Sequence, residues 1–176
     1  LRRWSASGAE LAGRDGALFR FLHCSKRSVV GALGDPEIDA LVASADLVVE
    51  SFPCGVIEDY DLLSRFPGLV VLSITPYGRG GPLTNRPATE FTVQAEAGSA
   101  ARRGTEDMEP YHAAGRIADY VGATFAALGG MAALRRSLRT GHGEHVDVSL
   151  LEAMTIANST YADLTHRLAG SPPITT

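Results

Sequence analysis

The 176-residue chain has 16 Lys and Arg against 20 Asp and Glu, a formal net charge of −4, and 45% hydrophobic residues. This length and composition suit one sizeable soluble domain or a large part of a bigger one. The negative balance gives no general attraction to nucleic acid or to an anionic membrane. Cys24 and Cys54 form no disulfide framework, and the polar N-terminus has no apolar signal core, so we expect a cytoplasmic protein.

The first third of the chain begins irregularly. We expect a loop over 1–16, followed by a short apolar stretch and a basic turn over 17–30 that end in a strand. A helix is expected over 35–45, because Asp35 can serve as N-cap and Pro36 stands at the first helical position.

Strand and helix patterns then alternate. Residues 46–50 form a short apolar run typical of a buried strand, and 55–66 predict a helix that ends at Pro67. Residues 69–78 are rich in β-branched side chains and predict the next strand. Strand, helix and strand at this spacing indicate a βαβ unit, and therefore an α/β fold with a parallel sheet and helices on its faces.

The second half of the chain is expected to contain three helices and one strand. Helices are predicted over 89–97 and 117–139, with a turn-rich segment and a charged loop around them. The alternating residues 144–150 predict a strand, and "SLLE" reads as a capping box that opens a last helix ending near Arg167. The longest apolar stretch is interrupted by Gly129 and Gly130, so we expect no membrane span.

Asp119 lies in the first turn of the helix predicted over 117–139, at the front of a run of small apolar residues. Helix N-termini favour a carboxylate, so one interpretation is an acid that only stabilises the helix start. The other is a nucleophile or acid–base group with room for a substrate. That room would come from small neighbours: Ala113, Ala114, Gly115, Ala118, Gly122 and Ala123.

Glu90 stands at the start of the helix predicted over 89–97 and could share acid–base or positioning work with Asp119. Cys54 follows a strand and precedes a helix, but no sequence signal supplies an activating partner, so a spectator thiol is favoured over a catalytic one. The histidines lack the spacing of metal ligands, and we expect no metal site. They are His23, His112, His142, His145 and His166.

Several segments in order resemble the class III CoA-transferases of the CaiB/BaiF type, which include formyl-CoA transferase, carnitine CoA-transferase and the α-methylacyl-CoA racemases. They are "FLHCSKRSV", "ADLVVESFPCGVIE", "PGLVVLSITPYGRGGP", "NRPATEFTVQAEAG", "AAGRIADYVGATFAALGGMAAL" and "RTGHGEHVDVSLLEAM". The resemblance runs from Leu1 to about Asn158.

The resemblance implies a function for the two acids. An enzyme of this kind moves CoA from an acyl-CoA to a carboxylic acid through aspartyl anhydride and aspartyl-CoA thioester intermediates. Asp119 matches the nucleophile and Glu90 a supporting acid of the family. A racemase would carry a histidine at the position of Thr89, so the resemblance favours transfer over racemisation.

The resemblance also implies a CoA pocket that includes Ser51, Phe52 and Tyr77. This chain reads "ESF" where the family usually reads "ENF". Asp59 replaces an arginine, and a lysine that commonly follows "KRSV" has no counterpart. Fewer positive charges should weaken binding of the CoA phosphates. An alternative is therefore a catalytically incomplete member that serves as a structural or dimerising half.

The fold implied by the resemblance is a Rossmann-like parallel sheet flanked by helices, within a larger interlocked-dimer architecture. Residues 1–176 would form one α/β region that matches the N-terminal to middle part of the large domain. We expect the first βα unit and the small second domain to be absent. A homodimer or a complementary transferase chain would then cover apolar surface that this region leaves open.

Overall fold

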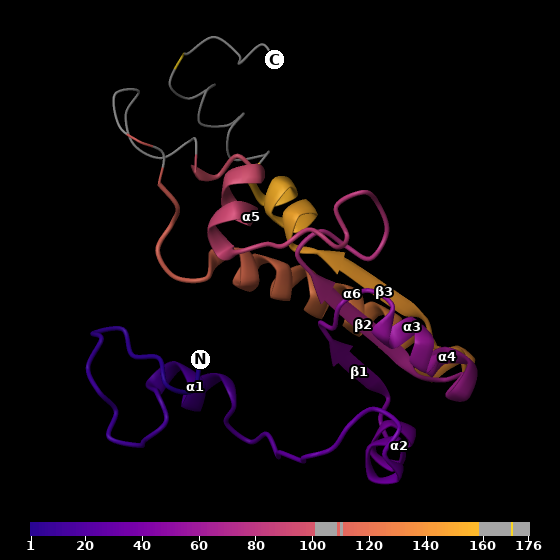
Figure 1. Ribbon diagram of the computed structural model, residues 1–176. Coiled ribbons are helices and arrows are strands. Elements are labelled where there is room, and N and C mark those ends of the chain that lie inside the picture. The colour runs from indigo at the N-terminus through magenta and orange to yellow at the C-terminus, as the bar shows by residue number, and fades with distance from the viewer. Residues whose placement is uncertain (101–108, 110, 159–169, 171–176) are drawn as a thin grey trace.

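The computed structural model describes residues 1–100, 109, 111–158 and 170 (Figure 1). Within them, three parallel strands form one sheet in the order β1-β2-β3. The strands are β1 (Leu47–Glu50), β2 (Val70–Thr75) and β3 (His145–Ser149). All three were predicted from their apolar or alternating patterns, and the parallel α/β architecture is confirmed.

Helices cover both faces of this sheet. The labelled helices are α1 (Ala17–Leu22), α2 (Pro36–Ala43), α3 (Val56–Tyr60), α4 (Leu62–Arg65), α5 (Glu90–Glu96) and α6 (Ile117–Thr140). A further helical segment, 150–158, directly follows β3. The Ser149 hydroxyl oxygen caps it by accepting a hydrogen bond from the Glu152 N–H at 3.2 Å. The predicted continuation to Arg167 lies outside the described residues.

Two sequence predictions are wrong in detail. No strand ends the segment 17–30: α1 ends at Leu22, and Val30 is 95% exposed. A strand needs a neighbour for its backbone groups, and no described strand pairs with this segment. The helix expected over 55–66 is divided at Asp61, whose φ of +49° is left-handed, a conformation that aspartate tolerates better than most residues.

The two sheet faces are packed differently. On one face, Val71 and Leu69 pack with Ile57 of α3 and Leu62 of α4. On the other face, α6 lies against β2 and β3, and small residues let it approach closely. A Cβ added at Gly130 would lie 3.1 Å from the Leu72 side chain. The buried stripe of α6 consists of Ala118, Gly122, Ala126, Gly130, Ala133 and Ser137.

The opposite side of α6 is apolar and exposed. Leu128, Met131 and Leu138 are 67%, 63% and 71% exposed, which agrees with the expected uncovered apolar surface. The helix continues through Gly129 and Gly130, as predicted for a helix over 117–139. By length and composition α6 would also fit a membrane span, the one such helix among the described residues. Its small-residue stripe nevertheless packs on the sheet as the core helix of a globular domain does.

Gly143 is the position where the connection from α6 to β3 crosses the segment before β2. Its N–H donates to the Pro67 carbonyl at 2.7 Å, and an added Cβ would lie 1.8 Å from the Leu69 carbonyl oxygen. Backbone cannot move aside as a side chain can. We expect Gly143→Ala to lower the free energy of unfolding by about 2–3 kcal/mol, measured by urea denaturation. Gly80→Ala is the control, because its added Cβ would meet open space; equal losses would contradict the close crossing.

Candidate functional site

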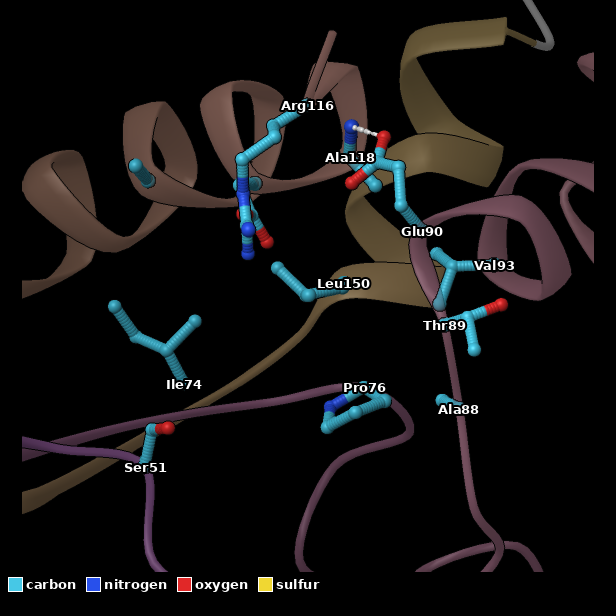
Figure 2. Close-up of a pocket in the computed structure, with 12 residues that line it drawn as sticks. Ser51, Ile74, Pro76, Ala88, Thr89, Glu90, Val93, Arg116, Ala118 and Leu150 are labelled. Carbon is cyan, nitrogen blue, oxygen red and sulfur yellow. Dashed lines mark hydrogen bonds and ion pairs between the residues drawn. The ribbon is translucent and has the colours of Figure 1, made fainter. Parts of the chain in front are cut away.

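A pocket of about 500 Å³ opens where the three parallel strands end at their carboxyl sides (Figure 2). Ser51 follows β1, Pro76 follows β2 and Leu150 follows β3, and this is the edge where α/β proteins bind ligands. The first turns of α5 and α6 also contribute to the pocket wall. Its wall consists of Ser51, Ile74, Pro76, Ala88, Thr89, Glu90, Val93, Arg116, Ala118, Asp119, Ala123 and Leu150.

Asp119 lies in the first turn of α6 and lines this pocket. Its side chain is 39% exposed and forms an ion pair with Arg116, three positions earlier. The Nε of Arg116 donates to one Asp119 oxygen. This hydrogen bond from the guanidinium to the carboxylate raises the pKa of Arg116 above its usual value. Sequence reasoning did not select Arg116, because an arginine before a helix is usually solvated.

Glu90 reaches the same helix start from α5. Its Oε1 accepts a hydrogen bond from the Ala118 N–H at 2.8 Å (Figure 2). The same oxygen accepts another from the Gln94 side chain, also at 2.8 Å. Glu90 therefore satisfies one of the free N–H groups of α6. Asp119 and Glu90, chosen as a pair from the sequence, line one pocket and are tied to the same helix turn.

Gln94 fixes the loop that leads into α6. Its side chain is fully buried. Its Oε1 accepts from the Ala113 N–H at 2.8 Å, and its Nε2 donates to the Ala113 carbonyl at 3.3 Å. This role is not apparent from the sequence, since glutamine in a helix usually faces water. In the structure Val93, its neighbour on α5, is buried as well.

Of the three residues expected in a CoA pocket, Ser51, Phe52 and Tyr77, not all line this pocket. Ser51 lines the pocket, whereas the other two are outside its wall. The Phe52 side chain is 42% exposed. Tyr77 is 7% exposed, and its hydroxyl has no hydrogen-bond partner among the described residues. Thr89, at the position that a racemase fills with histidine, caps α5 by accepting from the Thr92 N–H at 3.2 Å.

Comparison with known proteins identifies the family of this chain. A sequence model of CoA-transferase family III matches residues 1–173. The chain belongs to CoA-transferase family III. This confirms both the family expected from the motifs and the fold class.

Three similar proteins show how much of the family architecture this chain represents. It is 29% identical to the succinate–glutarate CoA-transferase of Agrobacterium fabrum, over 98% of this chain and 46% of that protein. It is 32% identical to the succinyl-CoA–L-malate CoA-transferase beta subunit of Chloroflexus aurantiacus, over 74% of this chain and 35% of that protein. A CaiB/BaiF family crystal structure from Brucella suis superposes with a TM-score of 0.79 at 28% identity, covering 98% of this chain and 48% of that one. The chain thus spans less than half the length of these relatives.

A buried ion-pair network lies next to Ser51, at the point where the chain leaves β1. Arg79 and Glu50 have side chains that are 5% and 1% exposed, with 3.2 Å between Nη1 and Oε1. The other Glu50 oxygen accepts from the Phe52 N–H at 2.7 Å. The Ser73 hydroxyl also donates to Glu50. The network therefore holds the chain where it leaves β1, next to Ser51 in the pocket wall.

Glu58 extends this network toward the surface, where its side chain is 47% exposed. The Arg79 guanidinium donates to both of its oxygens, which lowers the pKa of Glu58 from 4.5 to about 2. The ion pair therefore adds stability above pH 4.5, and this contribution is lost as the pH falls toward 2.

We expect Glu58→Gln to reduce the stability lost between about pH 6 and about pH 3. Because solvent screens the pair, the effect should be up to about 1 kcal/mol. Urea unfolding at both pH values measures it. Glu10→Gln, in the exposed N-terminal loop, is the control. A Glu58→Gln variant with an unchanged pH slope would contradict the assignment.

Cys54 and His145 lie outside the wall of this pocket, and the His145 Nε2 is 2.7 Å from the Ser73 hydroxyl oxygen. The Cys54 thiol is half-buried and donates to the Arg79 carbonyl at 3.4 Å, in keeping with a spectator role. No cluster of three or more metal-ligating side chains occurs in the part of the chain that the structure describes. The charged side chains in the pocket wall are Asp119, Glu90 and Arg116.

Proposed function

We propose that this protein transfers CoA from an acyl-CoA to a carboxylic acid, with Asp119 as the nucleophile. The observation that carries the proposal is the position of Asp119 in the pocket wall, in the first turn of α6 and at the carboxyl edge of a parallel sheet. The names of the relatives support the reaction class, and both name dicarboxylic acids or their CoA thioesters.

The reaction proceeds in four acyl-transfer steps. An Asp119 oxygen attacks the thioester carbonyl, the C–S bond breaks, and CoA leaves as the thiolate with a mixed anhydride formed on Asp119. The thiolate then attacks the Asp119 carbonyl, which releases the donor acid and leaves an aspartyl-CoA thioester. The acceptor carboxylate attacks that thioester to give a second anhydride and CoA thiolate. The thiolate takes the acceptor acyl group and restores the Asp119 carboxylate.

The start of α6 supplies the electrostatic support for these steps. Its dipole and first-turn N–H groups favour negative charge next to Asp119. Glu90 holds that turn through the Ala118 N–H, so we assign Glu90 a positioning role. The small Ala123 in the pocket wall leaves space for the thioester to approach.

The test is the conversion of a ¹³C-labelled carboxylic acid to its CoA thioester by the purified chain, followed by mass spectrometry. Succinyl-CoA serves as donor and labelled glutarate as acceptor. Labelled glutaryl-CoA formed in proportion to enzyme is the expected result. No labelled thioester from a folded chain that binds CoA would contradict the proposal.

The second candidate is a structural or dimerising half that acts beside an active transferase subunit. It is favoured by the coverage of less than half of each relative and by the exposed apolar side of α6. A relative named as a beta subunit shows that the family includes multi-subunit enzymes. Titration of free CoA by calorimetry separates the two candidates: saturable binding favours transfer, and its absence from a folded sample favours the structural half.

Racemisation is less well supported than either candidate. A racemase needs two acid–base groups on opposite sides of the acyl α-carbon. Thr89 stands where one of them would be, and its hydroxyl is engaged in capping α5. Exchange of deuterium into the α-position of a branched acyl-CoA would be the observation that favours it.

A further inference from the structure

Arg116 is the one cationic side chain in the pocket wall among the residues that the structure describes. The wall also carries two carboxylates, Asp119 and Glu90. Two like charges oppose the entry of an anionic substrate unless a cation balances them. Transfer of an uncharged acyl group requires no cation in the pocket wall. The proposed reaction alone therefore does not explain the presence of Arg116.

The guanidinium of Arg116 has hydrogen-bonding capacity to spare. Its Nε donates to Asp119, while its two terminal nitrogens have no hydrogen bond to a described residue. Figure 2 shows the side chain extending from the start of α6 into the pocket, toward Leu150 and Ile74. A guanidinium fork matches a carboxylate bidentately, and the Arg116 side chain is 60% exposed, which leaves it free to turn toward a ligand.

The rest of the wall suits a short hydrocarbon chain. Its apolar surface comes from Ile74, Val93 and Leu150, and the small side chains of Ala118 and Ala123 leave space. The volume of about 500 Å³ is within the range of small-molecule sites. A ligand with a few methylene groups and a carboxylate at its far end satisfies both the apolar wall and the guanidinium.

We propose that Arg116 selects dicarboxylic substrates. Its guanidinium gives up the ion pair with Asp119 and pairs instead with the distal carboxylate of the acyl group or of the acceptor acid. In the ligand-free protein the guanidinium holds Asp119. When a second carboxylate takes the guanidinium, Asp119 is released for attack at the near carbonyl. The release of the nucleophile rests on the proposed function, whereas recognition of the dicarboxylate does not require turnover.

Calorimetric titration with succinate and butyrate tests the recognition directly, because butyrate has a methyl group in place of one carboxylate. Arg136→Gln is a matched control for Arg116→Gln. Both arginine side chains are 60% exposed and paired with a carboxylate, but Arg136 pairs with Glu144 outside this pocket. We expect the wild type and Arg136→Gln to bind succinate at least about 10-fold more tightly than butyrate. Arg116→Gln should lose that preference.

A wild type that binds no succinate, or that shows no preference for it, would overturn the inference. So would an Arg116→Gln variant that keeps the preference. Turnover gives a second readout when the acceptor is a monocarboxylate such as acetate: Arg116→Gln should lower kcat/KM for succinyl-CoA about 10- to 100-fold and lower kcat/KM for butyryl-CoA by a smaller factor. An Arg116-dependent preference without any transfer would support the inference and contradict the proposed function. Transfer without the preference would contradict the inference and support the proposed function.

Discussion

Asp119→Asn is expected to lower kcat for CoA transfer about 10⁴-fold or more, while CoA binding is retained. The amide has nearly the shape of the carboxylate but cannot attack a thioester to form an anhydride. Since Asp119 is partly exposed at the start of α6, the loss of its charge should cost the helix only about 0.3–1 kcal/mol. Initial rates with succinyl-CoA and calorimetric titration of CoA separate the chemical effect from binding.

Asp46→Asn is the control for this substitution, because Asp46 is exposed and lies before β1, outside the pocket. Its rate should stay within about twofold of the wild type, as expected for a surface change. If Asp119→Asn keeps more than about a tenth of the wild-type kcat, Asp119 is not the nucleophile. Asp119 would then be an acid that only stabilises the helix start.

Arg79→Met is expected to lower the free energy of unfolding by about 3–5 kcal/mol. Methionine has a similar reach but leaves Glu50, whose side chain is 1% exposed, buried without its cation. The remaining donors to Glu50 are the Ser73 hydroxyl and the Phe52 N–H, which do not neutralise a buried charge. Arg79 also donates to the Phe52 carbonyl at 3.4 Å, so its loss should loosen the pocket wall next to Ser51.

Urea denaturation of Arg79→Met and of Arg136→Met measures this effect. The Arg136 pair is exposed, and breaking it should cost less than about 1 kcal/mol. The double variant Glu50→Gln with Arg79→Met should recover part of the loss, because no uncompensated charge is then buried. Equal losses for the two arginines would show that the Arg79 network contributes no more than a surface ion pair.

The main elements of the fold could be predicted because their patterns are local. The apolar and β-branched runs that became β1 and β2 are readable within a few residues. The start of α6 was placed correctly with Asp119 in its first turn. Local patterns failed where the outcome depended on distant partners. Val30 sits in a strand-like sequence, but no described strand pairs with it.

The candidate site was predictable only in part for the same reason. Asp119 and Glu90 were found because each begins a helix, and the motif resemblance linked them. Glu50 and Arg79 are separated by 29 positions, and only the parallel crossover from β1 to β2 brings them together. Arg116 could have been suspected from its i, i+3 spacing to Asp119. Its direction into the pocket follows from the non-helical backbone at the start of α6 (φ −124°, ψ 61°), which the sequence does not reveal.

The most direct test of the central claim is to trap the covalent intermediate on Asp119. The purified chain would be incubated with succinyl-CoA and hydroxylamine, which converts an aspartyl anhydride or thioester to a stable hydroxamate, and the modified residue would be located by peptide mass spectrometry. The expected result is a hydroxamate on Asp119 that depends on succinyl-CoA and is absent from Asp119→Asn. If the chain binds and transfers CoA with no modification at Asp119, or with the modification on another carboxylate, Asp119 is not the nucleophile.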